Sequence, residues 1–194
     1  MTIKQNIFRL FYPVLIKIGK IFGVNKKILS SKAIAITNFY NLKAVLGNGD
    51  DYNFIKLKGK KVLIVNTASN CGYTAQYNDL EKLYNSNKEK LEIIAFPAND
   101  FKEQEKDDDL KIAAFCKINF SVSFSIMKKC IVVKSKNQNI VYDWLTNIEK
   151  NGWNNQTPTW NFCKYLIDEK GNLTHFFEAP VSPLSNEIIS AIEQ

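Results

Sequence analysis

The sequence predicts an α/β fold built on a mixed central sheet. Two observations carry this prediction: continuous apolar, β-branched runs at 61–66 and 91–96, and helical spacing of apolar residues after each run. Such runs are typical of strands buried on both faces, and strands that alternate with helices form a parallel sheet covered by helices. Two further strands, 162–167 and 173–177, flank a polar turn typical of a hairpin. This hairpin should add antiparallel strands.

The expected order from residue 61 is β-α-β-α-β-α-β-β-α, with a third strand at 130–133. Thr74 is the expected N-cap of the first helix, and Ser182-Pro183 should open the last one. The acids Asp107–Asp109 stand where the dipole of the second helix favours negative charge. The residues expected to face inward are Tyr77, Leu80, Leu83 and Tyr84 in the first helix; Leu110, Ala113, Ala114 and Ile118 in the second; Val141, Trp144, Leu145 and Ile148 in the third; and Leu184, Ile188 and Ile192 in the last.

The length of 194 residues suits one α/β domain with an appendage. We divide the chain into a basic N-terminal extension, 1–35, and a domain, 36–194. The net charge of +7 comes from the first 49 residues, which carry eight basic side chains and no acidic one. The rest of the chain is close to neutral, so nucleic-acid binding is not expected.

The segment 5–23 repeats apolar residues at spacings of three and four, with basic residues between them and Pro13 inside. The basic residues argue against a membrane-spanning helix, and the polar stretch 25–32 argues against a signal peptide cut near Ala35. Three interpretations stay open: an amphipathic helix on an anionic membrane surface, a helix packed on the domain or a partner, and a targeting segment.

Four cysteines, Cys71, Cys116, Cys130 and Cys163, stand far apart, without a CxxC pair and with a single histidine in the chain. This spacing supports neither a zinc site nor a secreted disulfide framework. We therefore expect a reducing, cytoplasmic location, with membrane association only through the N-terminal helix. Cys130 and Cys163 fall within strand patterns and are expected to be core residues.

Cys71 has the position that reactive chemistry needs. It follows the strand 61–66 and precedes a helix, and ligands of open α/β folds bind at the carboxyl ends of the strands. The helix N-terminus favours a thiolate, and Gly72 lets the backbone approach a ligand closely. A partly exposed thiol of low pKa can be oxidised by a peroxide to sulfenic acid. From position alone, a small packed cysteine in a turn is an equal alternative.

Three segments change that balance. They are Asn66–Thr74 (NTASNCGYT), Phe96–Glu105 (FPANDFKEQE) and Trp160–Leu166 (WNFCKYL). In this order they resemble the conserved blocks of glutathione peroxidases. The resemblance runs from about residue 37 to the C-terminus. It implies a thioredoxin-like fold and a thiol peroxidase that reduces hydrogen peroxide and organic hydroperoxides without a cofactor.

The resemblance places the catalytic tetrad of the family on Cys71, Gln104, Trp160 and Asn161. The indole and amide groups are donors that do not titrate near neutral pH, and they can stabilise a thiolate and the charge that develops on the departing oxygen. Cys116 matches the position of a resolving cysteine, so the resemblance implies a disulfide between Cys71 and Cys116 that thioredoxin, or glutathione, reduces. If the fold keeps these two thiols apart, the helix of Cys116 must unwind locally.

The short segment 150–159 resembles monomeric, thioredoxin-dependent members of the family rather than glutathione-specific tetramers. The sequence departs from the family pattern at Ala98, Asp100, Lys106-Asp107 and Ser125. These departures bear on loop geometry and substrate preference more than on the tetrad. Two other functions stay open: a peroxide sensor that relays oxidation to a partner protein, and a non-catalytic thioredoxin-like scaffold.

Overall fold

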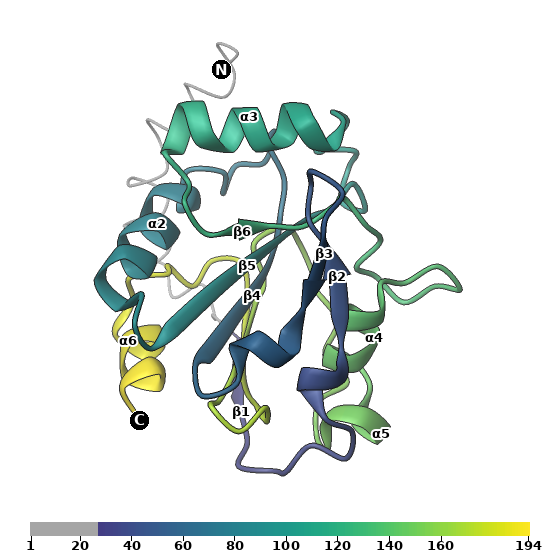
Figure 1. Ribbon diagram of the computed structural model, residues 1–194, viewed down its shortest axis with the longest axis vertical. Helices are drawn as coiled ribbons and strands as arrows, with labels where there is room; N and C mark the ends of the chain where they lie inside the picture. The colour runs from purple at the N-terminus through teal and green to yellow at the C-terminus, as the bar shows by residue number, and fades with distance from the viewer. Residues whose placement is uncertain (1–26) are drawn as a thin grey trace.

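The computed structural model describes residues 27–194 (Figure 1). Its main sheet has six strands in the order β1-β8-β7-β4-β5-β6. They are β1 Ile28–Ser30, β4 Lys61–Thr67, β5 Leu91–Pro97, β6 Ser125–Ile126, β7 Lys164–Ile167 and β8 Leu173–Phe177. Strands β4, β5 and β6 are parallel, whereas β7, β8 and β1 join them antiparallel. The expected mixed sheet and terminal hairpin are confirmed.

Five described helices surround the sheet: α2 Gln76–Asn87, α3 Asp109–Phe120, α4 Ile140–Leu145, α5 Ile148–Asn151 and α6 Asn186–Glu193. In Figure 1, α2 and α6 lie to one side, α4 and α5 to the other, and α3 crosses the end of the sheet. A two-stranded sheet, β2 Lys43–Val45 with β3 Asp51–Asn53, and two short 3-10 helices, η1 Phe39–Asn41 and η2 Phe54–Leu57, complete the fold.

The core forms on both faces of the sheet because β4 is buried throughout. Val62 and Ile64 point to the face covered by η1, η2 and α4, whereas Leu63 and Val65 point to the face covered by α2, α3 and α6. Alternate side chains of a strand point to opposite faces, so a continuous apolar run serves both cores at once. Cys71 and Cys116 belong to the core on the face covered by α2, α3 and α6, and Cys163 belongs to the core on the face covered by η1, η2 and α4.

The inward face expected for α3 was wrong. Leu110 is 71% exposed and Ile118 is 80% exposed, whereas the buried residues are Ile112, Cys116 and Phe120. Apolar residues are spread around this helix, so their spacing could not choose the face. Its start agrees with the expected dipole, because the side chain of Asp108 accepts a hydrogen bond of 2.9 Å from the backbone N–H of Lys111.

The expected third strand at 130–133 was also wrong. The strand that extends the sheet is β6, whose Ser125 and Ile126 pair with Ile94 and Ala95. Residues 130–133 form an irregular segment with one isolated bridge, from Ile131 to Gln138. Short two-residue strands depend on tertiary pairing rather than on local apolar content.

Several element boundaries differ from the prediction. The third helix is divided into α4 and α5, and β7 begins at Lys164 because Phe162 has a left-handed φ of 70°. The last helix begins at Asn186, capped by Ser185, instead of at Ser182-Pro183, and Leu184 is exposed.

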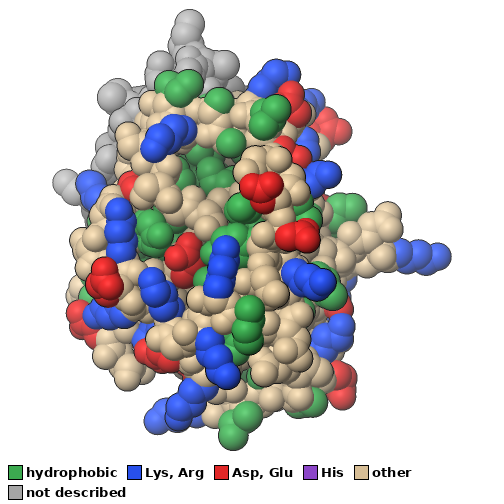
Figure 2. All heavy atoms as spheres, in the orientation of Figure 1, with side chains coloured by type: hydrophobic (Ala, Val, Ile, Leu, Met, Phe, Trp, Pro, Cys, Tyr) green, Lys and Arg blue, Asp and Glu red, His purple; other side chains and the backbone are tan. Residues whose placement is uncertain are grey.

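The interpretations of the segment 5–23 lie outside the described residues. Among residues 27–194, no helix has the length and apolar content required to cross a membrane. Strand β1 pairs with β8, so part of the segment that we assigned to the extension joins the main sheet. On the face shown in Figure 2, basic and acidic side chains are interspersed.

Candidate active site

The carboxyl ends of β4 and β5 lie at one edge of the sheet, because the two strands are parallel with Thr67 opposite Pro97. The turn that carries Cys71 follows β4, and the loop that carries Gln104 follows β5. The two loops are linked by a backbone hydrogen bond of 3.0 Å from Asn70 N–H to the Gln104 carbonyl.

The third part of the site comes from the segment before β7, which runs antiparallel to β4 and therefore starts at the same edge. Asn66, near the end of β4, fixes this segment. Its Nδ2 donates to the Trp160 carbonyl at 2.9 Å, and its Oδ1 accepts from Cys163 N–H at 3.1 Å. The sequence alone did not predict this role of Asn66, although Asn66 opens the first of the three segments that carry the family resemblance.

Thr74 closes the turn of Cys71 instead of capping α2. Its hydroxyl oxygen accepts from Cys71 N–H at 3.1 Å and lies 2.8 Å from the carbonyl oxygens of both Ala68 and Cys71. The residue that precedes α2 is Ala75, which makes no side-chain cap. The expected N-cap was therefore wrong, because the hydroxyl bonds backward into the turn.

The thiol of Cys71 is buried, with the residue only 1% exposed. Tyr73 N–H lies 3.4 Å from its Sγ, and the side chains of Trp160 and Asn161 and the N–H of Gly72 also interact with it. Burial raises the pKa of the Cys71 thiol above its ordinary value, and these donors lower it by less. The expectation of a partly exposed thiol with a low pKa was wrong for the reduced protein, because desolvation outweighs the donors.

Gln104 joins the site through Asn161, whose Nδ2 donates to Gln104 Oε1 at 2.9 Å. Asn161 is fully buried, and its Oδ1 has no hydrogen-bond partner among the described residues. The structure therefore gathers all four residues of the expected tetrad: Trp160 and Asn161 at the thiol, and Gln104 one hydrogen bond further away.

The backbone on both sides of this arrangement is strained. Lys102 and Glu103 have φ values of 52° and 51° just before Gln104, and Phe162 has 70° just after Asn161. Left-handed conformations of this kind cost free energy in non-glycine residues and gather at functional sites. The ring of Trp160 is covered by Phe101, with centroids 5.7 Å apart, and by the Lys102 ammonium, 5.6 Å from its centroid.

Cys116 lies on α3 and is fully buried in the same core as Cys71. Burial raises the pKa of its thiol to about 12, and the neighbouring Tyr77 hydroxyl lowers it by less. Both cysteines are free thiols. The structure thus describes the reduced protein, with Cys116 held inside the helix.

Glu105 was missed as part of the site. It is fully buried, and its Oε2 accepts from Ser69 N–H at 2.8 Å and from the Ser69 hydroxyl at 3.0 Å. The available signal was its position: Glu105 ends the second segment that carries the family resemblance, directly after Gln104.

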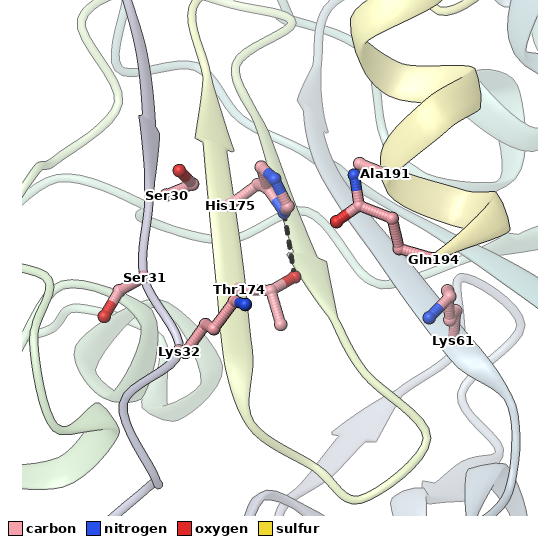
Figure 3. A pocket seen from close by; sticks show the side chains of 8 residues that line it. All are labelled: Ser30, Ser31, Lys32, Lys61, Thr174, His175, Ala191 and Gln194. Carbon is pink, nitrogen blue, oxygen red and sulfur yellow. Dashed lines mark hydrogen bonds between the residues drawn. The ribbon is translucent and has the colours of Figure 1, made fainter.

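One pocket lies elsewhere, between β1, β8 and the end of α6 (Figure 3), with a volume of about 370 Å³. It is lined by Ser30, Ser31, Lys32, Lys61, Thr174, His175, Ala191 and Gln194. Lys61 begins β4 and Cys71 follows the end of that strand, so this pocket is at the opposite end of the sheet from the thiol. Within residues 27–194, no three His, Cys, Asp or Glu side chains are grouped so that they could hold a metal ion.

Comparison with known proteins identifies relatives of the chain. The family model of glutathione peroxidase matches residues 39–146. The glutathione peroxidase-like peroxiredoxin 2 of Saccharomyces cerevisiae is 40% identical over 161 residues, which cover 81% of this chain and 99% of the yeast protein.

Two solved structures extend the comparison. The apo form of Trgpx is 32% identical, with a TM-score of 0.62 over 82% of this chain and 98% of its own. A thiol:disulfide interchange protein of the thioredoxin family, from Chlorobium tepidum, is 13% identical with a TM-score of 0.56 over 86% of this chain and 100% of its own, and it shows the fold alone. The expected thioredoxin-like fold is confirmed. The chain belongs to the glutathione peroxidase family and is a peroxidase, an oxidoreductase that reduces hydroperoxides.

Proposed function

We propose that Cys71 is the peroxidatic residue and that Gln104, Trp160 and Asn161 assist it. The observation that carries this proposal is the set of donors around one buried sulfur: the backbone N–H of Tyr73 and the side chains of Trp160 and Asn161. Donors fixed around a reacting atom stabilise charge as it develops and need no reorganisation during the reaction.

In the first step the sulfur of Cys71 attacks the terminal oxygen of a hydroperoxide, ROOH, and the O–O bond breaks. The thiol proton passes to the departing oxygen, so the products are the sulfenic acid of Cys71 and ROH. A thiol whose pKa is raised by burial carries this proton into the reaction. The Asn161 side chain interacts with the thiol, and its Oδ1, which has no hydrogen-bond partner among the described residues, can accept the O–H of the substrate.

In the second step the Cys116 sulfur attacks the sulfenic acid, a disulfide forms, and water leaves. Because Cys116 is fully buried on the inner side of α3, this helix has to open locally first. We propose that a dithiol protein of the thioredoxin type then reduces the disulfide and that the protein acts as a cytoplasmic monomer. Light scattering coupled to size-exclusion chromatography tests the oligomeric state.

The decisive experiment measures peroxide consumption supported by thioredoxin, thioredoxin reductase and NADPH. Cys71→Ser should abolish turnover. Cys116→Ser should allow one oxidation and then stop, whereas Cys163→Ser, in the other core, should continue to turn over. Mass spectrometry of peroxide-treated protein with blocked thiols should find the 71–116 disulfide. Undiminished turnover by Cys71→Ser would falsify the assignment.

For the segment 5–23 we propose contact with an anionic membrane surface, on the basis of its basic and amphipathic sequence. Co-sedimentation with anionic liposomes should pellet the full chain and not a chain that starts at Lys27, which retains β1. Equal pelleting of the two forms would exclude the contact.

A further inference from the structure

The side chain of Glu105 presents a buried carboxyl group whose two oxygens differ. Oε2 accepts two hydrogen bonds from Ser69, two residues before Cys71. Oε1 is buried and has no hydrogen-bond partner among the described residues. The backbone of Glu105 is also held, since its N–H donates to Asn99 Oδ1 at 2.9 Å. The carboxyl group is therefore held in place with one oxygen left unsatisfied.

The surroundings of Glu105 connect it to Cys116. The carboxyl group interacts electrostatically with the Cys116 thiol and with the Tyr77 hydroxyl. Tyr77 lies beside both the Cys116 thiol and the Thr67 hydroxyl. None of these polar contacts is a full hydrogen bond. Tyr77 OH, Thr67 Oγ1 and Glu105 Oε1 each have no hydrogen-bond partner among the described residues. Thr67, Tyr77, Glu105 and Cys116 are all fully buried, and these interactions join them into one polar cluster.

Charge is costly in this cluster. The charged groups that act on Glu105 from the neighbouring segments are Asp107, which disfavours its ionised form, and Lys129, which favours it. Burial is the dominant effect, and it raises the pKa of Glu105 to about 7 in spite of the two hydrogen bonds from Ser69. At neutral pH the group is thus divided between a neutral acid and a buried carboxylate.

We propose that Glu105 is a positioning residue for Cys116, which keeps the thiol docked in α3 while its own carboxyl group is protonated and promotes its release when the carboxyl group ionises. Release of Cys116 from α3 removes one member of the buried cluster and lets water reach Glu105 Oε1. The carboxylate is then hydrated, whereas in the docked state it is desolvated. This inference rests on the proposed role of Cys116 as resolving thiol.

The direction of the pH effect follows from linkage. The docked state has the higher Glu105 pKa and therefore binds more protons than the open state, so a rise in pH favours opening. If the open-state pKa returns to its ordinary value of 4.5, the open fraction should increase about thirtyfold between about pH 5.5 and about pH 8.5. Glu105→Gln keeps an acceptor for Ser69 but cannot ionise. Titration of residue 105 should therefore not change the open fraction of this variant with pH.

The test measures the rate at which iodoacetamide alkylates Cys116 in reduced Cys71→Ser protein, by peptide mass spectrometry across this pH range. The same measurement on Cys71→Ser/Glu105→Gln corrects for the titration of the thiol itself. The ratio of the two Cys116 rates should rise about thirtyfold across this pH range. The ratio for Cys163, which packs in the other core, should stay level and reports global unfolding if it rises.

A second measurement follows formation of the 71–116 disulfide after one equivalent of hydrogen peroxide, in proteins that retain both cysteines. The parent protein should resolve faster than Glu105→Gln at the upper end of the pH range, and the difference should shrink as pH falls. Parallel pH profiles in both measurements overturn the inference and leave the proposed function intact. Absence of the 71–116 disulfide from the parent protein overturns the role of Cys116, and the inference with it.

Discussion

Asn161 Nδ2 donates a 2.9 Å hydrogen bond to Gln104 Oε1, across 57 positions of the sequence. The same Asn161 side chain interacts with the Cys71 thiol. One amide therefore joins the loop after β5 to the turn after β4, and the position of Gln104 at the site depends on it.

Loss of this amide should slow the reaction of Cys71 with peroxide. We expect Asn161→Ala to lower the second-order rate constant by about tenfold to a hundredfold, because the thiol loses a donor and Gln104 loses its anchor. Asn161→Asp should lower it further, since a carboxylate repels both the developing thiolate and Gln104 Oε1. Stopped-flow measurement of Cys71 oxidation gives the constant. Asn78→Ala, which removes an amide bonded to the Ala75 carbonyl, is the matched control. A change smaller than the control's would contradict this role.

The indole of Trp160 should act on the titration of Cys71. Its interaction lowers a thiol pKa that burial raises, so Trp160→Phe should shift the alkylation profile of Cys71 to higher pH. At neutral pH the variant should therefore react more slowly. The pH dependence of iodoacetamide labelling checks this shift. Phe101→Leu changes the ring packed on Trp160 without removing a donor, and an equal shift in that variant would assign the effect to packing.

The sequence could predict the position of Cys71 because local features determine it. The buried run of β4 ends at a short turn, and the residues of that turn belong to a specific motif. The sequence could not predict that the thiol is buried with a raised pKa, since this depends on Trp160 and Asn161, which arrive from a distant segment. It also missed Glu105, whose partner Ser69 stands 36 positions away.

The face of α3 shows a second limit of local patterns. Leu110 and Ile118 fit an inward face as well as Ile112 and Cys116 do, because apolar residues occur around most of the helix. Only the packing of α3 against Tyr77 and its neighbours decides which set is buried. For the same reason the sequence pointed to Cys116 as a candidate resolving thiol but could not show that Cys116 is buried.

Lys164 should stabilise the segment 179–181, whose Ala179 carbonyl also accepts a hydrogen bond of 2.7 Å from Gln76 Nε2 in α2. Its fully buried ammonium group donates to the carbonyls of Val181 at 2.6 Å and Ala179 at 3.3 Å. Lys164→Met should lower the free energy of unfolding by about 1 to 3 kcal/mol, because buried carbonyls lose donors. Urea denaturation measures the loss. Lys170→Met, at an exposed turn, should change stability by less than about 0.5 kcal/mol, and equal effects of the two substitutions would refute the buried role.

Glu105 should make stability depend on pH in the direction opposite to that of a salt-bridged acid. Its folded-state pKa of about 7 lies above the ordinary 4.5, so the folded protein binds more protons and loses stability as pH rises from about 4.5 through about 7. The loss contributed by this group should reach up to about 3 kcal/mol above that window.

Urea denaturation of the Cys116→Ser protein, with and without Glu105→Gln, isolates this contribution. Both proteins lack the Cys116 thiol, so their other titrations cancel in the difference between the two free energies of unfolding. That difference should move in favour of the Gln variant as pH rises, and most of the movement should occur below about pH 8. A constant difference would show that the carboxyl group has the same pKa folded and unfolded, and the buried, half-satisfied environment described for it would then be wrong.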